Sequence, residues 1–238
     1  MMTSVSDPRL NPAHSMTTYA VRGPLVRWLA SEAGRGHEEL GPYRVLDVGC
    51  GAKPYEPLFA PYATSYVGVD PVENPRAELR GSIESLPVED GAFDVVLCNQ
   101  VLEHCDDPAL AVRELRRVTA PRGRVLASTH GVMPYHPSPT DYWRWTHAGL
   151  EKLFVDGADW ASVRVTPASG TTACVGMIVA MNLDLALRRL HAQRMSPALV
   201  TAINRAAEAI DRRTPRLREP TQPGTLFANF HVVAEVAA

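Results

Sequence analysis

The sequence predicts an α/β protein in which helices cover both faces of a mostly parallel sheet. Two observations indicate this class: short apolar runs alternate with helical patterns, and a Gly-x-Gly turn follows the first run. The apolar runs cover residues 44–48, 65–69, 93–97 and 123–128. Nearly continuous apolar strands that alternate with helices are typical of parallel sheets buried on both faces.

The helices are predicted from apolar spacing and from capping residues. In chain order, the predicted helices cover residues 19–33, 107–118, 146–155, 174–192 and 197–212. Thr146 is a favourable N-cap, as is Asp107. We expect residues 1–18 to be loosely ordered, because they are rich in Ser, Thr, Pro and Asn, and residues 34–42 to form a linker.

Two further strands are predicted to close the sheet, at 162–166 and 230–236. The segment between them has about 50 residues, which is too long for a hairpin loop, so it is an added helical element. We therefore expect a single domain over 1–238. Its parts are an N-terminal helical segment (about 1–40), a core (about 41–170), a helical insertion (about 172–224) and a last strand (about 227–237).

The composition excludes several classes of protein. Apolar residues make up 45% of the 238 residues and the net charge is −2, so the chain is not intrinsically disordered. With 24 basic and 26 acidic residues, no bulk positive field draws it to nucleic acid or to a membrane. Residues 1–11 lack the apolar core of a signal peptide, and 173–187 looks too short and too polar to span a bilayer.

The four cysteines, Cys50, Cys98, Cys105 and Cys174, lack the spacing of a zinc site. Cys50 and Cys98 lie at the ends of apolar runs, where a buried free thiol is the usual outcome. We therefore expect no bound metal, a reducing environment and a cytoplasmic location.

The strongest functional signal is the turn Asp47-Val48-Gly49-Cys50-Gly51 at the end of the first predicted strand. Glycines at such a turn let the backbone approach a ligand closely. Asp70 ends the next strand, where a carboxylate can accept both hydroxyls of a ribose. A tight structural turn with a capping Asp is the alternative interpretation, and Pro54 stands where a dinucleotide fingerprint has a third small residue.

Four motifs together resemble the class I S-adenosylmethionine-dependent methyltransferases, in particular the group with the type-11 methyltransferase domain. They are VLDVGCGAKPY (45–55), YVGVD (66–70), SIESLPVEDGAFDVVLCNQVLEH (82–104) and DDPALAVRELRRVTAPRGRVLAST (106–129). The resemblance implies a seven-stranded Rossmann-like sheet that binds S-adenosyl-L-methionine across its strand ends.

The resemblance also implies a role for individual residues. Asp47, Gly49 and Gly51 would face the methionine part of the cofactor, and Asp70 would hold the ribose. Ser82 and Ile83 would border the adenine, and Asn99 with Gln100 would lie beside the sulfonium. Many family members have an acidic residue at the position of Ser82, and a serine accepts a hydrogen bond less strongly than a carboxylate. In the family the pair Glu103-His104 usually supports the fold, which we prefer to a role for His104 as a base.

A second informative stretch is MPYHPSPTDYWRWTH, residues 133–147. It follows the fourth strand, and ligands of open α/β sheets lie just outside the carboxyl ends of strands. We therefore predict a substrate wall that comprises Tyr135, Tyr142, Trp143, Arg144 and His147. Trp143 and Trp145 have a competing interpretation as core anchors, and Arg144 as a structural ion-pair partner. A similar DYWRWT run occurs in a subset of the family, often linked to sugar or natural-product modification.

The helical insertion is rich in arginine. A helix pair packed on the sheet edge, with a solvated arginine face, is the preferred interpretation. A lid over the substrate and a homodimer interface are the alternatives.

These observations predict a methyltransferase (EC 2.1.1.-) that methylates an oxygen of a small molecule, such as a sugar or a secondary metabolite. His136 is the predicted general base, with Asp141 as its orienting partner or a substrate ligand. The expected partner is a small-molecule substrate. Three alternatives stay open: an NAD-dependent oxidoreductase, a non-catalytic cofactor-binding module, and an RNA or protein methyltransferase.

Overall fold

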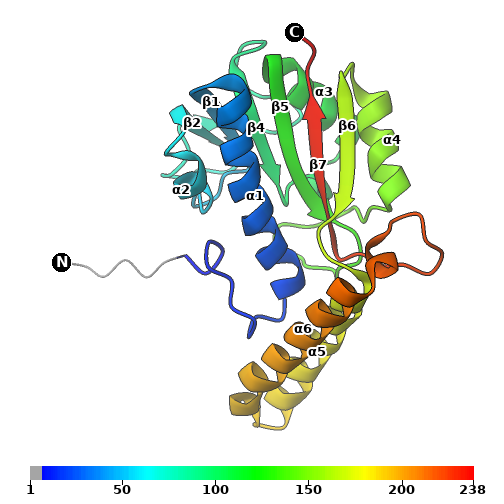
Figure 1. Cartoon of the computed structure of the whole chain (residues 1–238). Coiled ribbons are helices and arrows are strands. Elements are labelled where there is room, and N and C mark those ends of the chain that lie inside the picture. Colours follow the sequence, from blue (N-terminus) through cyan, green and yellow to red (C-terminus); the bar gives the residue numbers. More distant parts are fainter. Residues whose placement is uncertain (1–6) are drawn as a thin grey trace.

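The computed structural model describes residues 7–238, and within them seven strands form one sheet in the order β3-β2-β1-β4-β5-β7-β6 (Figure 1). The strands are β1 (Tyr43–Val48), β2 (Ala63–Asp70), β3 (Leu79–Arg80), β4 (Phe93–Asn99), β5 (Thr119–His130), β6 (Ser162–Pro167) and β7 (Asn229–Glu235). The first five strands pair in parallel, and β7 is antiparallel to both of its neighbours. The predicted mostly parallel, Rossmann-like sheet is confirmed.

Helices cover both faces of this sheet. They are α1 (Tyr19–Leu40), α2 (Glu56–Phe59), α3 (Pro108–Val118), α4 (His147–Gly157), α5 (Thr171–Arg189) and α6 (Ser196–Arg213), with short 3₁₀ turns η1 (Leu102–His104), η2 (Gln193–Met195) and η3 (Pro215–Arg218). Neighbouring residues of β1 serve opposite faces: Val45 packs in the cluster with α1, and Leu46 in the cluster with α3 and α4. The apolar run of β1 is thus buried on both sides.

Capping residues set the starts of two helices as predicted. Asp107 accepts hydrogen bonds from the backbone nitrogens of Ala109 and Leu110, both at 3.0 Å, and Pro108 opens α3. Thr146 Oγ1 accepts from Gly149 N at 3.0 Å at the start of α4. These side chains satisfy backbone donors that the first turn of a helix leaves unpaired.

The prediction of a linker over 34–42 is wrong, because α1 continues to Leu40 and is followed by Gly41 with φ 73°. The reason is close packing: a Cβ on Gly36 would lie 3.2 Å from the Tyr43 ring. Residues 7–18 form turns that are tied down, since the Asn204 amide donates to the carbonyls of His14 and Met16. Residues 1–6 lie outside the described part of the chain.

The helical insertion is a hairpin of α5 and α6 that projects from the lower edge of the sheet (Figure 1). Its base packs on α1 through Cys174 and Met177, which contact the cluster of Ala20 and Val21. By length and composition α5 could cross a membrane, with a mean hydropathy of 1.3, which corrects the expectation for 173–187; core helices of globular proteins also meet this criterion. All four cysteines are buried and free, as predicted for Cys50 and Cys98.

Candidate active site

The turn after β1 has the backbone geometry that its glycines were predicted to provide. Gly49 has φ 65° and Gly51 has φ 51°, both in the left-handed region. A Cβ on Gly49 would lie 2.5 Å from Val101 Cγ2, so no larger side chain fits. The backbone nitrogens of Gly49 and Cys50 both lie within hydrogen-bond distance of Val69 O, at 2.9 and 3.2 Å. The turn is therefore fixed against the end of β2.

A cavity of about 410 Å³ lies beside this turn, within the usual size range of small-molecule sites. Six of the residues predicted for the site line it: Asp47, Gly49, Gly51, Asn99, Gln100 and His136. Sequence reasoning missed the contribution of the N-terminal segment, which adds Arg9, Thr18 and Arg22. The cavity thus joins the ends of β1 and β4 to α1 and to the loop after β5.

Asp47 is buried at the end of β1, where its Oδ2 accepts a hydrogen bond from the Tyr66 hydroxyl at 2.8 Å. Burial raises the pKa of Asp47 to about 7, although the Tyr66 hydrogen bond lowers it in part. The carboxyl group is thus poised to gain or lose a proton near neutral pH.

Asp70 ends β2, as the sequence predicted, and its carboxylate has several hydrogen-bond partners in this structure. Its carboxylate accepts hydrogen bonds from Gly51 N at 3.1 Å, Val72 N at 3.2 Å and the Asn74 amide at 3.1 Å, and it is not among the residues that line the cavity. In this structure Asp70 therefore holds the backbone of the glycine turn at Gly51.

The end of β4 presents polar groups to the cavity. Both polar atoms of the Asn99 side chain are buried and have no hydrogen-bond partner. Gln100 has φ 59°, and its amide donates to Ser128 Oγ at 3.0 Å and to Asn229 Oδ1 at 3.1 Å. Because buried polar atoms are costly when unpaired, the free amide of Asn99 fits a polar ligand in this cavity.

Ser82 and Ile83 do not line the cavity. The Ser82 hydroxyl donates to Glu84 Oε2 at 2.9 Å, and Ile83 is buried in the core cluster. They follow β3 closely in the chain.

Three histidines from different segments meet at the other end of the cavity: His104 in η1, His130 at the end of β5 and His136 in the following loop. The ring centre of His136 lies 5.2 Å from that of His104 and 6.1 Å from that of His130. Across residues 7–238, no three histidine, cysteine or acidic side chains are arranged to hold a metal ion.

Glu103 and His104, which we expected to support the fold, both line the cavity. Glu103 does have a structural role, since its backbone carbonyl accepts from Tyr142 N at 2.7 Å. His130 escaped sequence reasoning, although its place just beyond the predicted fourth strand is a usual position for a site residue.

Burial drives Glu103 and His130 toward their neutral forms. Their Oε1 and Nε2 atoms lie 3.3 Å apart. Burial raises the pKa of Glu103 to about 7 and lowers the pKa of His130 to about 4. Burial also lowers the pKa of His104, whose Nδ1 lies 2.9 Å from the Thr140 carbonyl oxygen and so is the donor. The other ring nitrogen of His104 is then an acceptor.

His136 and Asp141, the predicted catalytic pair, are brought together: His136 Nε2 lies 3.3 Å from Asp141 Oδ2. Asp141 also accepts a hydrogen bond from Arg144. Burial raises the pKa of Asp141, but the hydrogen bond and charge of Arg144 outweigh it and lower the pKa below its usual value. Asp141 is thus an anionic partner that can orient the His136 ring.

The other predicted substrate residues lie outside the cavity. Tyr135 and Tyr142 are exposed, and His147 Nε2 contacts the Val165 carbonyl at 3.0 Å. Arg144 donates to the carbonyl of Met133, which braces the loop. Trp143 stacks on Trp145 at 5.7 Å, and Trp145 packs against the core. The segment's contribution to the cavity is Met133, His136 and Ser138.

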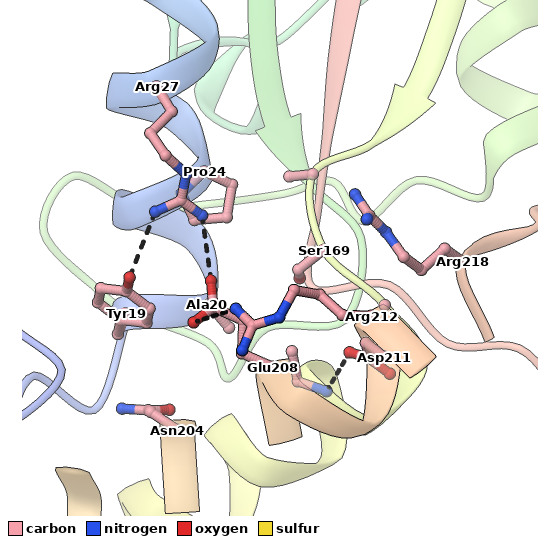
Figure 2. A pocket seen from close by; sticks show the side chains of 13 residues that line it. Tyr19, Ala20, Pro24, Arg27, Ser169, Asn204, Glu208, Asp211, Arg212 and Arg218 are labelled. Carbon is pink, nitrogen blue, oxygen red and sulfur yellow. Dashed lines mark hydrogen bonds and ion pairs between the residues drawn. The ribbon is translucent and has the colours of Figure 1, made fainter. Parts of the chain in front are cut away.

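A second cavity, of about 320 Å³, lies between α1 and the base of the α5–α6 hairpin (Figure 2). In Figure 2, Arg27 of α1 and Arg212 of α6 converge on Glu208, with nitrogen–oxygen distances of 3.4 Å each. None of the residues predicted for the site lines this cavity. Its ion pairs fix the hairpin to α1.

Comparison with known proteins agrees with this geometry. Residues 46–127 match the family model described as "Methyltransferase domain". An uncharacterized methyltransferase of Bacillus subtilis, YcgJ, is 36% identical over 104 residues (37% of this chain, 41% of YcgJ). A ubiquinone biosynthesis O-methyltransferase of Pseudomonas aeruginosa is 34% identical over 119 residues (44% of this chain, 49% of the enzyme). The chain spans less than half the length of these curated relatives.

A solved structure shares the fold. It is the 1,6-didemethyltoxoflavin-N1-methyltransferase of Burkholderia thailandensis with bound S-adenosylhomocysteine, with a TM-score of 0.51, 15% identity and coverage of 100% of this chain and 94% of that one. Residues 46–127 of this chain therefore carry a methyltransferase domain, as the four motifs predicted.

Proposed function

We propose that this protein transfers a methyl group from S-adenosylmethionine to a hydroxyl oxygen of a small molecule, with a sugar or a secondary metabolite as the leading class. The observation that supports this most directly is the single cavity that joins the glycine turn to the His136–Asp141 pair. A relative whose name states O-methylation adds support.

The residues around the glycine turn fit the cofactor. Asp47 would accept hydrogen bonds from the amino group of its methionine part, and the bare backbone at Gly49 and Gly51 would let it approach closely. Arg9 and Arg22 line the same cavity and would suit its carboxylate. We retain Asp70 for the ribose, Ser82 and Ile83 for the adenine, and Asn99 with Gln100 beside the sulfonium.

When bound, the cofactor supplies an electrophilic methyl group on its sulfonium. His136 would accept the proton of the substrate hydroxyl while the oxygen–carbon bond forms and the carbon–sulfur bond breaks. His136 would hold this proton after the transfer. Asp141 would orient the imidazole and stabilise its protonated form. A positioned general base contributes about 10²–10⁴-fold to such a step.

A non-catalytic cofactor-binding module and an RNA or protein methyltransferase are the remaining alternatives. The family match argues against the NAD-dependent oxidoreductase, and Pro54 lies where a dinucleotide fingerprint has a small residue. A cytoplasmic location and a role in natural-product biosynthesis stay predictions from the sequence.

The deciding experiment compares the wild-type protein with His136→Ala, using cofactor labelled in its methyl group and fractionated metabolite extracts. We expect turnover of the true acceptor to fall by about 10²–10⁴-fold. Calorimetry should show S-adenosylhomocysteine affinity within about threefold of wild type, a difference of less than 1 kcal/mol. The reason is that His136 is proposed to act on the acceptor hydroxyl and not to hold the cofactor. His191→Ala, in the exposed connection between α5 and α6, is the matched control.

Two outcomes would contradict the proposal in different ways. Full turnover by His136→Ala would remove His136 as the base while leaving the methyltransferase intact. If the wild-type protein binds S-adenosylhomocysteine yet labels no acceptor in any extract, the non-catalytic module is favoured.

A further inference from the structure

The α5–α6 hairpin presents its far end to solvent while its base is anchored. Glu208 ties the base to Arg27, and Met177 is fully buried there. We call residues 185–199, where the chain turns between the two helices, the hairpin tip. The tip projects away from the sheet on the same side as the carboxyl ends of β4 and β5, which border the candidate site (Figure 1).

The tip exposes large apolar side chains. Half of the fourteen exposed large apolar residues described for this chain lie in the hairpin. The four in the tip are Leu185 (48% exposed), Leu190 (75%), Met195 (57%) and Leu199 (37%). Leu190 and Met195 lie at the turn itself, where neither helix can cover them. Clustered exposed apolar groups indicate an interaction surface.

The same region is positively charged although the whole chain is not. Residues 185–199 contain three arginines (Arg188, Arg189 and Arg194) and no Asp or Glu, whereas the full chain has 26 acidic and 24 basic residues. The nearest acid is Asp184, which pairs with Arg188 at 2.7 Å. The net charge of −2 for the whole chain therefore conceals a local excess of positive charge at the hairpin.

We propose that the hairpin tip docks on a membrane surface that carries anionic headgroups. Exposed arginines interleaved with Leu190 and Met195 match the chemistry of that interface, because headgroup phosphates attract the charges and the acyl boundary takes up the apolar side chains. The expectation of no membrane partner was based on the net charge, which does not detect this local excess of positive charge. Docking brings the edge of the sheet with the candidate site toward the bilayer.

A second copy of the chain fits the tip less well. In a twofold-symmetric dimer the same surface meets itself. Arg189 and Arg194 would then face their own counterparts, and the nearest acid, Asp184, already pairs with Arg188. The predicted homodimer through the insertion is thus disfavoured at the tip.

The test is cosedimentation of the full chain with vesicles. We expect binding to phosphatidylcholine vesicles with about 30% phosphatidylglycerol to be at least tenfold tighter than to phosphatidylcholine alone, and to weaken at least tenfold as salt rises from about 0.05 to 0.5 M. The triple variant Arg188→Gln/Arg189→Gln/Arg194→Gln should lose at least tenfold. Leu190→Ser/Met195→Ser should weaken binding at both salt concentrations, because it removes the apolar contribution.

The matched control is Arg80→Gln/Arg113→Gln/Arg164→Gln, which removes three exposed arginines from other surfaces. It makes the same change in net charge and should retain wild-type binding. The proposal is overturned if the two triple variants behave alike, or if wild-type binding is equal on neutral and anionic vesicles. It is also overturned if sedimentation shows a dimer that Leu190→Ser/Met195→Ser dissociates while vesicles bind neither protein. Both lipid comparisons use wild-type protein, so a misfolded variant does not impair the test.

Discussion

At the scale of single residues, Asp47 shows how one buried group can set the conditions for ligand binding. The sequence places it correctly beside a glycine turn, since a local motif carries that information. Its protonation depends on burial and on the Tyr66 hydroxyl, which lies 19 positions away in the chain and 2.8 Å away in the structure. The sequence therefore predicted that Asp47 lies at the site. Its raised pKa could not be predicted, because it depends on burial in the folded protein.

We expect S-adenosylhomocysteine affinity to rise about tenfold from pH 6 to pH 8. The ligand's amino group favours the ionised form of Asp47, and with a pKa of about 7 the free protein is mostly protonated at pH 6 and mostly ionised at pH 8. Calorimetric titration across this range measures the effect.

Two variants complete this experiment. Asp47→Asn should bind about tenfold more weakly at pH 8 and should lose the pH dependence, because the charge-assisted hydrogen bond is gone. Asp94→Asn changes a carboxyl at the opposite end of β4, where it pairs with Arg44, and should keep the wild-type profile. If the wild-type affinity stays constant from pH 6 to pH 8, ligand binding does not depend on the ionisation of Asp47.

At the scale of elements, local signals predicted well and long-range packing did not. Asp107 and Thr146 cap their helices because the necessary contacts lie within three residues. The extension of α1 beyond residue 33 depends on the packing of Gly36 against the Tyr43 ring. The glycines of this segment favour a linker in a sequence-based prediction, and this tertiary contact has no local signal. The two-residue strand β3 and the single turn of α2 are too short to leave a periodic pattern.

The start of α5 depends on a cap from another helix. Asp211 of α6, which is buried, accepts hydrogen bonds from Thr172 N at 3.0 Å and Ala173 N at 2.9 Å. Asp211→Ala leaves both donors unpaired, so we expect a loss of about 2 kcal/mol in the free energy of unfolding, measured by urea denaturation.

Asp156→Ala is the control for this prediction. It removes an exposed carboxylate that pairs with Lys152 four residues away in α4, and it should cost at most about 0.5 kcal/mol. Equal losses for Asp156→Ala and Asp211→Ala would show that the contact between α6 and the start of α5 adds nothing beyond an ordinary surface pair.

At the scale of the whole molecule, the candidate site is assembled from parts that no single stretch of sequence reveals. His104, His130 and His136 come from three segments, and Arg9 and Arg22 come from the N-terminal region. The motifs predicted the glycine turn, and position predicted His136. The meeting of the histidines depends on how η1, β5 and the following loop pack, for which the chain has no local signal.

Packing of the whole molecule also determines its response to acid. His231 lies in the middle of β7, where its ring stacks on Trp28 of α1 at 4.3 Å and its Nε2 has no hydrogen-bond partner. Burial lowers the pKa of His231 to about 3. Between that value and about 6.5 the unfolded chain binds a proton that the folded chain does not, so this residue's contribution to stability is lost as pH falls below about 6.5.

We therefore expect His231→Gln to change the pH dependence of stability. From pH 7.5 to 5.5 the wild-type protein should lose about 1.4 kcal/mol through His231, a loss that the glutamine variant avoids because it does not titrate. Urea denaturation at both pH values measures the difference between the two proteins at each pH, so any constant cost of burying glutamine cancels. His191→Gln, at an exposed position, should follow the wild-type curve. If wild type and His231→Gln lose the same stability over this range, the folded chain binds a proton at His231 as readily as the unfolded chain does, and the acid response has to come from other groups such as His130.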